Sequence, residues 1–434
     1  MRYIYSKLIK LFNEPRGIVS QANNNLNTEL RSILPFNLIK YETGTTVDSW
    51  QVPFAWELLK ADIKIGPSIY SKHDLPLLVP FGTESFSYSG HYKDLRDYII
   101  SLPEQPEATP YRTNYYSPTN HKVCIPYKIL SSLKDNTEVS IDVRSETKSS
   151  YLEILETFIK GQSDNEILIS TYNCHPGLGN DNFSGILGLC SIYEQLSKLK
   201  NPHYSYRFAI FPETIGAICY INSLSKRHII KNIICSTVLT CLGGKNLNYT
   251  FKDSPIASSY VDAYKKEIIK HIPDLSIYPY TPDGSDERQF SSPNVSIPSF
   301  SLCRNRYYEY DQYHTSLDTL QYMDLKSVST TSDLIFKTLK NVDKTHRVPK
   351  SSAKYGEPCL SSYSLDNYSG GGYNSKSSDS SIIYRKIITN LISASNGNST
   401  TEDVLTQTSL KLNLNKMHIV PIFNKLIELG VLTF

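Results

Sequence analysis

The chain has 434 residues, with 45 Lys or Arg against 42 Asp or Glu, and a formal net charge of only +3. This length exceeds what one hydrophobic core usually organises and predicts two or three domains. Because the net charge is close to zero, a global field that attracts nucleic acid or anionic membranes is excluded. We therefore expect no nucleic-acid or membrane partner, and we leave homo-oligomer formation open.

The sequence carries no apolar segment long enough to cross a bilayer. Its initial segment, MRYIYSKLIKLFNEPRG, interrupts short apolar groups with charged side chains, unlike a signal peptide. The eight cysteines form no CxxC pair, and apolar runs contain Cys190, Cys219, Cys235 and Cys241. Cysteines in such settings are typical of reduced core residues. These features predict a soluble, cytoplasmic protein.

Residues 60–122 differ in composition from the segments on either side. They are rich in Pro, Ser, Tyr and Gly and contain short alternating runs such as SFSYSGHY. Alternation of this kind is typical of half-buried strands. We predict a small β-rich module inserted into a discontinuous domain made of residues 1–59 and 123–345.

Within residues 123–345, short β-branched runs alternate with helical patterns. Residues 166–171 (EILIST) predict a buried strand, and residues 184–199 place apolar side chains at helical spacing. Further strands are predicted at residues 206–211, 233–242 and 297–303. This alternation implies an α/β fold, a mostly parallel twisted sheet with helices on both faces.

The last part of the chain predicts a separate module. Residues 346–380 include SLDNYSGGGYNSKSSDSS, which is too polar to fold alone and predicts a linker or surface loop. Residues 381–434 contain three helical patterns and a terminal strand, which predict a winged-helix domain. Five Lys or Arg against three Asp or Glu give this domain a net charge of +2. So small a charge favours packing or protein contact over DNA binding.

Candidate metal ligands follow the predicted strands. His175 and Asp181 lie in the run YNCHPGLGNDNFSG after the strand at 166–171, and Glu213 follows the strand at 206–211. His314 lies far downstream, after the strand at 297–303. Ligands bind at the carboxyl ends of strands in open α/β sheets, and imidazole and carboxylate groups can hold Zn²⁺. A glutamate beside such an ion can take a proton from the attacking water.

Three segments resemble motifs of the M28-type zinc aminopeptidases. They are Gly179–Gly185 (GNDNFSG), Pro212–Thr214 (PET) and Tyr313–Thr319 (YHTSLDT), in the same order as in that family. Ser285–Phe290 (SDERQF) is similar to the family's Ser-Asp-His-x-x-Phe stretch. More narrowly, the chain resembles bacterial aminopeptidase-like proteins with a small inserted domain of unknown function and a C-terminal winged helix. Some members lie among polysaccharide-biosynthesis genes, so the resemblance also implies a sugar-linked or amidated substrate as one option.

The resemblance implies a role for each candidate residue. His175, Asp181 and His314 are the implied metal ligands, and Glu213 is the implied catalytic base. Asp286, Glu287, Arg288 and Tyr313 are candidate substrate-binding residues, and Asp286 or Glu287 could instead serve as a further metal ligand. Asp318 is expected to brace the loop of His314.

Two positions depart from the family pattern. Thr214 stands where the family has a second glutamate, and Thr240 stands where it usually places a ligand aspartate. With two of the five usual ligands absent, we expect one zinc ion per chain in preference to two. Arg288 could then replace the second ion as a clamp on the developing negative charge.

Three functions fit these observations. The leading hypothesis is a zinc-dependent hydrolase of amide or peptide bonds, similar to an aminopeptidase and acting on a small peptide or amide. A second is a non-catalytic regulator or scaffold that uses the winged helix. A third is a glutaminyl-cyclase-like acyltransferase, which would use one zinc and a glutamate without attack by water.

Overall fold

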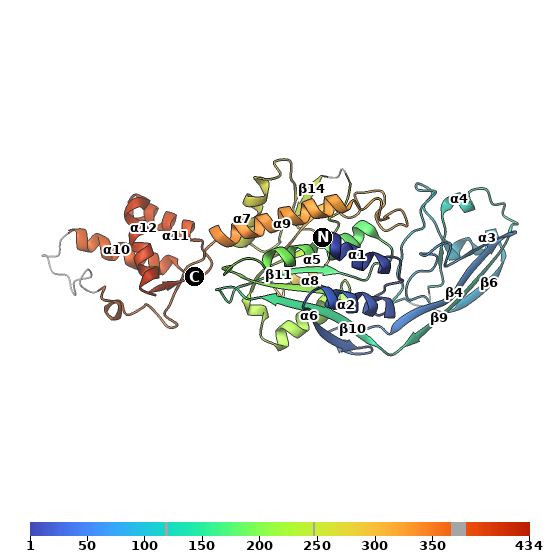
Figure 1. Ribbon diagram of the computed structural model, residues 1–434, viewed down its shortest axis with the longest axis horizontal. Helices are drawn as coiled ribbons and strands as arrows, with labels where there is room; N and C mark the ends of the chain where they lie inside the picture. Colours follow the sequence, from blue (N-terminus) through green and yellow to red (C-terminus); the bar gives the residue numbers. More distant parts are fainter. Residues whose placement is uncertain (118–119, 246–247, 366–378) are drawn as a thin grey trace. The chain divides into compact units, whose positions relative to one another are not determined.

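A mixed β-sheet organises much of the computed structural model, which describes all residues except 118–119, 246–247 and 366–378 (Figure 1). From edge to edge the sheet comprises β1 (Asn37–Glu42), β10 (Tyr151–Ile159), β12 (Ser205–Phe211), β11 (Glu166–Tyr172), β13 (Ile233–Leu239), β16 (Ser299–Arg304), β14 (Tyr249–Lys252) and β15 (Ser276–Tyr278). The central strands β12, β11, β13 and β16 run parallel. Strands β1 and β10, and also β14 and β16, pair in antiparallel fashion. The predicted α/β class is confirmed, and reversal at the edges makes the sheet mixed.

Helices cover both faces of this sheet (Figure 1). Helix α5 (Ser184–Leu196) packs against β11, β12 and β13, whereas α6 (Ile215–Lys226) and α8 (Glu287–Phe290) lie together on the other face. Apolar side chains of α6, such as Tyr220 and Leu224, share a buried core with Phe211 of β12. The remaining α-helices of more than four residues before residue 346 are α1 (Arg2–Leu8), α2 (Gln21–Ile33), α7 (Ser259–Ile269) and α9 (Leu325–Thr345).

A second sheet, antiparallel throughout, lies in the N-terminal part of the chain. It comprises β5 (Ser68–Ser71), β4 (Ala55–Ile65), β9 (Glu138–Lys148) and β6 (Phe86–His91), and it has its own buried core. Short elements that share this core are α3 (Tyr92–Leu95), β7 (Ile99–Ile100), β8 (Val123–Cys124) and α4 (Tyr127–Leu130). The short strands β2 (Thr46–Val47) and β3 (Trp50–Gln51) pair with each other and pack with the core that contains α6. Because β4 begins before residue 60 and β9 lies after residue 122, this sheet extends beyond the segment expected to form the inserted module. The division into domains at those residues stays a prediction.

The C-terminal residues form a compact unit with its own core. It contains α10 (Asp379–Ala394), α11 (Thr401–Leu412) and α12 (Lys416–Glu428), and β17 (Lys350–Ser351) pairs with β18 (Leu432–Thr433). The Thr400 side chain caps α11 in a reciprocal arrangement with Asp403. Leu365 also belongs to the core, so the described part of the expected linker is partly packed, while residues 366–378 lie outside the described residues. The assignment of this unit as a winged helix stays a prediction.

Two general expectations can be compared with the described residues. None of the helices found there is both long and apolar enough to cross a bilayer. Seven of the eight cysteines, all of which fall in the described ranges, are buried, and these include the four predicted to lie in the core.

A buried network of charges joins the strands of the large sheet. Arg207 of β12 donates from Nε to Glu166 Oε2 of β11 at 2.6 Å, and its Nη1 lies 2.9 Å from Glu156 Oε2 of β10. Tyr220 of α6 and Arg227, which directly follows that helix, also bond Glu156, at 2.6 and 2.7 Å. Since all three sheet residues are buried, each charge depends on these partners.

We expect Arg207→Met to lower the free energy of unfolding by about 3 kcal/mol, because it leaves Glu166 buried without its cation. Urea denaturation measures this change. Lys128→Met is the matched control, since the Lys128–Glu107 pair is exposed and its loss should cost less than about 0.5 kcal/mol. A loss in Arg207→Met as small as in the control would contradict this account.

Candidate metal centre

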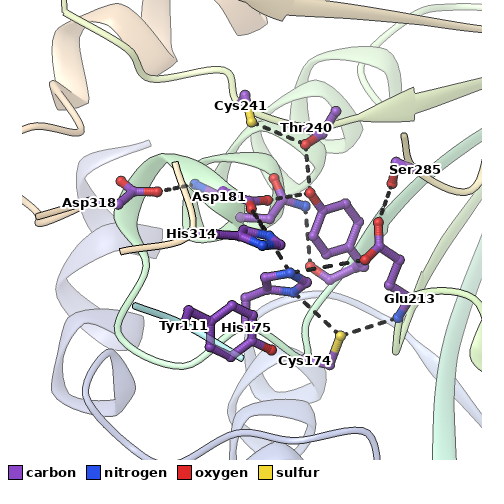
Figure 2. A network of polar contacts seen from close by, with 12 residues as sticks. Tyr111, Cys174, His175, Asp181, Glu213, Thr240, Cys241, Ser285, His314 and Asp318 are labelled. Atoms are coloured by element: carbon purple, nitrogen blue, oxygen red, sulfur yellow. Dashed lines mark hydrogen bonds and ion pairs between the residues drawn. The ribbon is translucent and has the colours of Figure 1, made fainter. Parts of the chain in front are cut away.

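The candidate metal ligands meet at the carboxyl ends of the parallel strands (Figure 2). His175 and Asp181 lie between β11 and α5, and His314 lies in the segment between β16 and α9. One ligand atom from each of the three residues lies within 4.8 Å of the other two. Within the part of the chain that the structure describes, this is the one group of at least three His, Cys, Asp or Glu with such spacing.

Both imidazoles face the same oxygen of Asp181. The distance from Asp181 Oδ2 is 3.0 Å to His314 Nε2 and 3.9 Å to His175 Nε2. Asp181 Oδ2 and His314 Nε2 are buried, and neither makes a hydrogen bond that meets normal geometry. Two nitrogen atoms converging on one oxygen without such a bond fit the donor set of a divalent cation.

The electrostatics of the site favour the forms of these residues that bind metal. Burial lowers the pKa of His175 to about 4, so its ring is neutral at neutral pH. Burial alone would raise the pKa of Asp181, but nearby His175 and His314 outweigh it and lower that pKa to about 2. A neutral imidazole and an ionised carboxylate are the metal-binding states.

The loop that carries Asp181 is held by Asp318. The Asp318 carboxylate accepts from the backbone N–H groups of Asn180 at 2.6 Å and Asp181 at 2.9 Å. Asp318 therefore braces the loop that carries Asp181. Because Asp318 lies four residues after His314, these bonds also join the chain segments of the two proposed ligands. Close packing also shapes this loop, because a Cβ on Gly185 would lie 2.3 Å from Asn182 Oδ1.

Thr240 directly follows β13, at the position where the resembled family usually places a ligand aspartate. Its hydroxyl oxygen lies 2.7 Å from the hydroxyl of Tyr172, and Tyr172 donates to Asp181 Oδ1. Thr240 therefore presents a hydroxyl and no carboxylate at this position (Figure 2). That hydroxyl supports Tyr172.

Glu213 follows β12 and faces the same centre. Its Oε2 lies 4.0 Å from His175 Nε2, and its Oε1 accepts a hydrogen bond from Ser285 Oγ at 2.7 Å. Burial, together with the charge of Asp181, raises the pKa of Glu213 above that of an ordinary glutamate. A carboxyl group of this kind can accept and return a proton near neutral pH.

A cavity of about 370 Å³ opens onto this centre. His175, His314, Glu213 and Arg288 line it. Arg288 Nη2 donates to Thr214 Oγ1 at 3.3 Å, which orients the guanidinium group beside Glu213. The structure thus brings together the three predicted ligands, the predicted base and one of the predicted substrate-binding residues.

The other three predicted substrate-binding residues make different contacts. Asp286 is buried and accepts from the backbone N–H of Thr214 at 2.8 Å. Glu287 is buried and bonded by Lys252 and Tyr307; Tyr313 stacks on His314, with ring centroids 4.0 Å apart. None of these three side chains is among the residues that line the cavity. These contacts indicate that the three residues position Glu213, Arg288 and His314 and do not touch a substrate directly.

The family described as "Domain of unknown function (DUF4910)" matches residues 5–345. The chain belongs to this family. It is 30% identical over 378 residues to a Clostridium acetobutylicum protein named "Putative polysaccharide biosynthesis protein with aminopeptidase-like domain", a match that covers 85% of this chain and 84% of that protein. The predicted resemblance to aminopeptidase-like proteins is therefore confirmed for this DUF4910 chain.

Solved structures extend this comparison to the fold. The crystal structure of a "putative peptidase" from Clostridium acetobutylicum has a TM-score of 0.73 at 25% identity and covers 100% of this chain and 96% of that chain. A zinc aminopeptidase from Bacillus subtilis has a TM-score of 0.56 at 15% identity and covers 79% of this chain and 94% of that chain. The second likeness shows a shared fold alone. This DUF4910 chain thus has an aminopeptidase-like α/β fold.

Two residues that contact the centre were missed by the sequence analysis. Tyr111, from the segment expected to be inserted, places its ring centroid 5.2 Å from those of His175 and His314, and its N–H donates to His314 O at 2.8 Å. Arg16 is buried and donates from Nη2 to His175 O at 2.7 Å. Neither residue lies in a motif, so only the folded structure reveals these contacts.

Arg16 ties the N-terminal segment to the metal loop. Besides His175 O, its guanidinium donates to the backbone oxygens of Leu11 at 2.7 Å and Phe12 at 3.0 Å. Phe12 O in turn accepts from Gly177 N at 3.1 Å. The buried Arg16 side chain therefore binds the backbone at residues 11–12 and at His175, and so holds the two segments together.

We expect Arg16→Ala to lower the free energy of unfolding by about 3 kcal/mol, because it leaves three buried backbone oxygens without this donor. Arg16→Lys should recover part of the loss, since an ammonium group can replace some of these bonds. Thermal and urea denaturation measure both variants. Exposed Arg144→Ala is the control, and an equal stability of Arg16→Ala and Arg144→Ala would refute the clamp.

Proposed function

We propose that this chain is a hydrolase of amide or peptide bonds that uses one zinc ion held by His175, Asp181 and His314. The observation that carries the proposal is the convergence of two imidazole nitrogens on Oδ2 of buried Asp181, which makes no hydrogen bond of normal geometry. The family match, the peptidase named among the solved structures and the zinc aminopeptidase with the same fold support it.

The residues present fit a zinc ion, which prefers nitrogen and oxygen ligands and leaves a position open when three protein ligands bind it. When bound, zinc supplies a Lewis acid that polarises a carbonyl group and makes water a better nucleophile. Glu213 takes a proton from the attacking water and returns it to the nitrogen of the leaving group. Ser285 holds Glu213 in place for both transfers.

Arg288 supplies the positive charge of the cavity. Its guanidinium lies beside Glu213 through the bond to Thr214, in the same cavity as the proposed ligands. We assign it the stabilisation of negative charge that develops on the carbonyl oxygen during attack. Because the Clostridium acetobutylicum relative is named for polysaccharide biosynthesis, a sugar-linked amide is the substrate class that we place first.

Elemental analysis tests the metal part of this proposal. We expect about one zinc per chain in the purified protein and none in a His175→Ala, His314→Ala double variant, because three ligands are needed for tight binding. A double variant of the exposed histidines, His73→Ala with His418→Ala, should keep its zinc. Two ions per chain would refute the single site, and no metal after zinc addition would refute the proposed function.

Glu213→Gln tests the catalytic part. We expect hydrolysis of responsive substrates in a panel of aminoacyl-4-nitroanilides and aminoacyl-glucosamine amides to fall by about 10² to 10⁴, because the amide side chain cannot accept the proton. The zinc content should stay unchanged, since Glu213 is not a proposed ligand. Exposed Glu104→Gln is the control and should keep its activity. Full activity of Glu213→Gln, or loss of its zinc, would contradict the role of base.

A further inference from the structure

A second and larger cavity, of about 1000 Å³, adjoins the cavity of the metal centre. The two cavities share Trp50, Tyr115 and Tyr116 as lining residues. The larger one also contains Trp56, so both tryptophans of the chain line it. A substrate whose reactive bond lies at the metal centre can therefore extend past Trp50 and Tyr116 into the larger cavity.

The walls of the large cavity are held by specific contacts. Thr83 O accepts from Trp56 Nε1 at 2.8 Å and from Ser145 Oγ at 2.7 Å, which ties the turn before β6 to β4 and β9. Gly82 has a φ of +90°, and a Cβ there would lie 2.8 Å from Tyr115 N. Only glycine permits this approach, so the shared wall has a defined position.

Aromatic faces in this cavity remain open to solvent. Tyr116 is 52% exposed and Phe54 is 47% exposed, although side chains of this size usually bury most of their surface. Trp50 meets Tyr116 edge to face, with ring centroids 5.2 Å apart and planes at 81°. Exposed ring faces next to polar groups suit a ligand that presents both C–H surface and hydroxyl groups.

The polar lining of the cavity selects the charge of its ligand. Glu84 and Glu146 line it together with the polar residues Ser49, Gln51 and Thr147, and no Lys or Arg is among its described lining residues. The nearby Lys148 donates to Glu57 at 2.7 Å. Two carboxylates disfavour an anionic ligand and favour hydroxyl or ammonium groups.

We propose that the large cavity binds a saccharide unit without negative charge, as the distal part of a substrate whose amide bond lies at the metal centre. The sugar ring packs its C–H face on Tyr116 and Phe54, while its hydroxyl or amino groups bond Glu84 and Glu146. The link to catalysis rests on the proposed function, but binding of the saccharide requires neither zinc nor Glu213.

Tryptophan fluorescence tests this assignment directly, because Trp50 and Trp56 are the only tryptophans of the chain. We expect a saturable change when the glucosamine trimer or the N-acetylglucosamine trimer is added to the full chain. Tyr116→Ala should weaken the binding of both trimers by at least about tenfold, because the sugar ring loses its stacking partner. Tyr355→Ala, which removes a ring that is 94% exposed and lines neither cavity, should leave both unchanged.

A second variant keeps the test informative if Tyr116→Ala disturbs the fold. Glu146→Gln should weaken binding of the cationic glucosamine trimer more than binding of the neutral N-acetylated trimer, because the variant removes one negative charge from the cavity. Trigalacturonic acid and the peptide triglycine are the comparison ligands, and neither should give a saturable response. No saturable response to either amino-sugar trimer, or an equal response to triglycine, would overturn the assignment.

The outcome is separable from that of the proposed function. Titrations of zinc-depleted protein and of Glu213→Gln should match those of the untreated chain, so saccharide binding would persist even if the chain contained no zinc. Conversely, a zinc-containing, active protein with no response to the trimers would overturn the saccharide site and leave the hydrolase proposal intact.

Discussion

The buried carboxylate of Asp181 is the constraint on which the rest of the site depends. Its side chain has no solvent exposure, and an ionised group in such a place is costly unless each oxygen meets a donor or a positive charge. Tyr172 donates to one oxygen, and His175 and His314 face the other. Asp318 fixes the direction of the loop by accepting from its backbone. A cation between the imidazoles and the free oxygen would complete this arrangement.

The sheet explains why residues so far apart in sequence meet there. Glu213 follows β12, His175 follows β11, Thr240 follows β13, and His314 lies beyond β16. These four strands are neighbours and run parallel, so their carboxyl ends share one edge of the sheet. Within the same sheet, the buried ion pairs of Arg207 with Glu156 and Glu166 connect β12 to its neighbours β10 and β11.

The sequence was sufficient wherever the signal was local. The apolar run at 166–171 and the helical spacing after Ser184 correspond to β11 and α5, and the motif residues His175, Asp181 and His314 do converge. Long-range contacts were not predictable, since Arg16 reaches His175 across 159 positions without any motif. Glu287 shows the same limit: it belongs to a local run of charged residues, but Lys252, 35 positions earlier, pairs with it in the interior. The bounds of the inserted module were predicted from composition, and composition does not reveal that β9, after residue 122, pairs with β4 and β6.

The position of Thr240 bears on how many metal ions this centre would hold. The two oxygens of a carboxylate can each bind a metal ion, so the contacts of both Asp181 oxygens matter. Here Asp181 Oδ1 accepts from Tyr172, whose hydroxyl is supported by Thr240, so only Oδ2 faces the imidazoles. Any ion held by Oδ1 would compete with the Tyr172 hydroxyl, and Thr240 beside it offers a neutral hydroxyl in place of a carboxylate. With Oδ1 bonded by Tyr172, only Oδ2 is left to face a metal ion, and this favours the single-zinc form of the proposed function over a two-ion form.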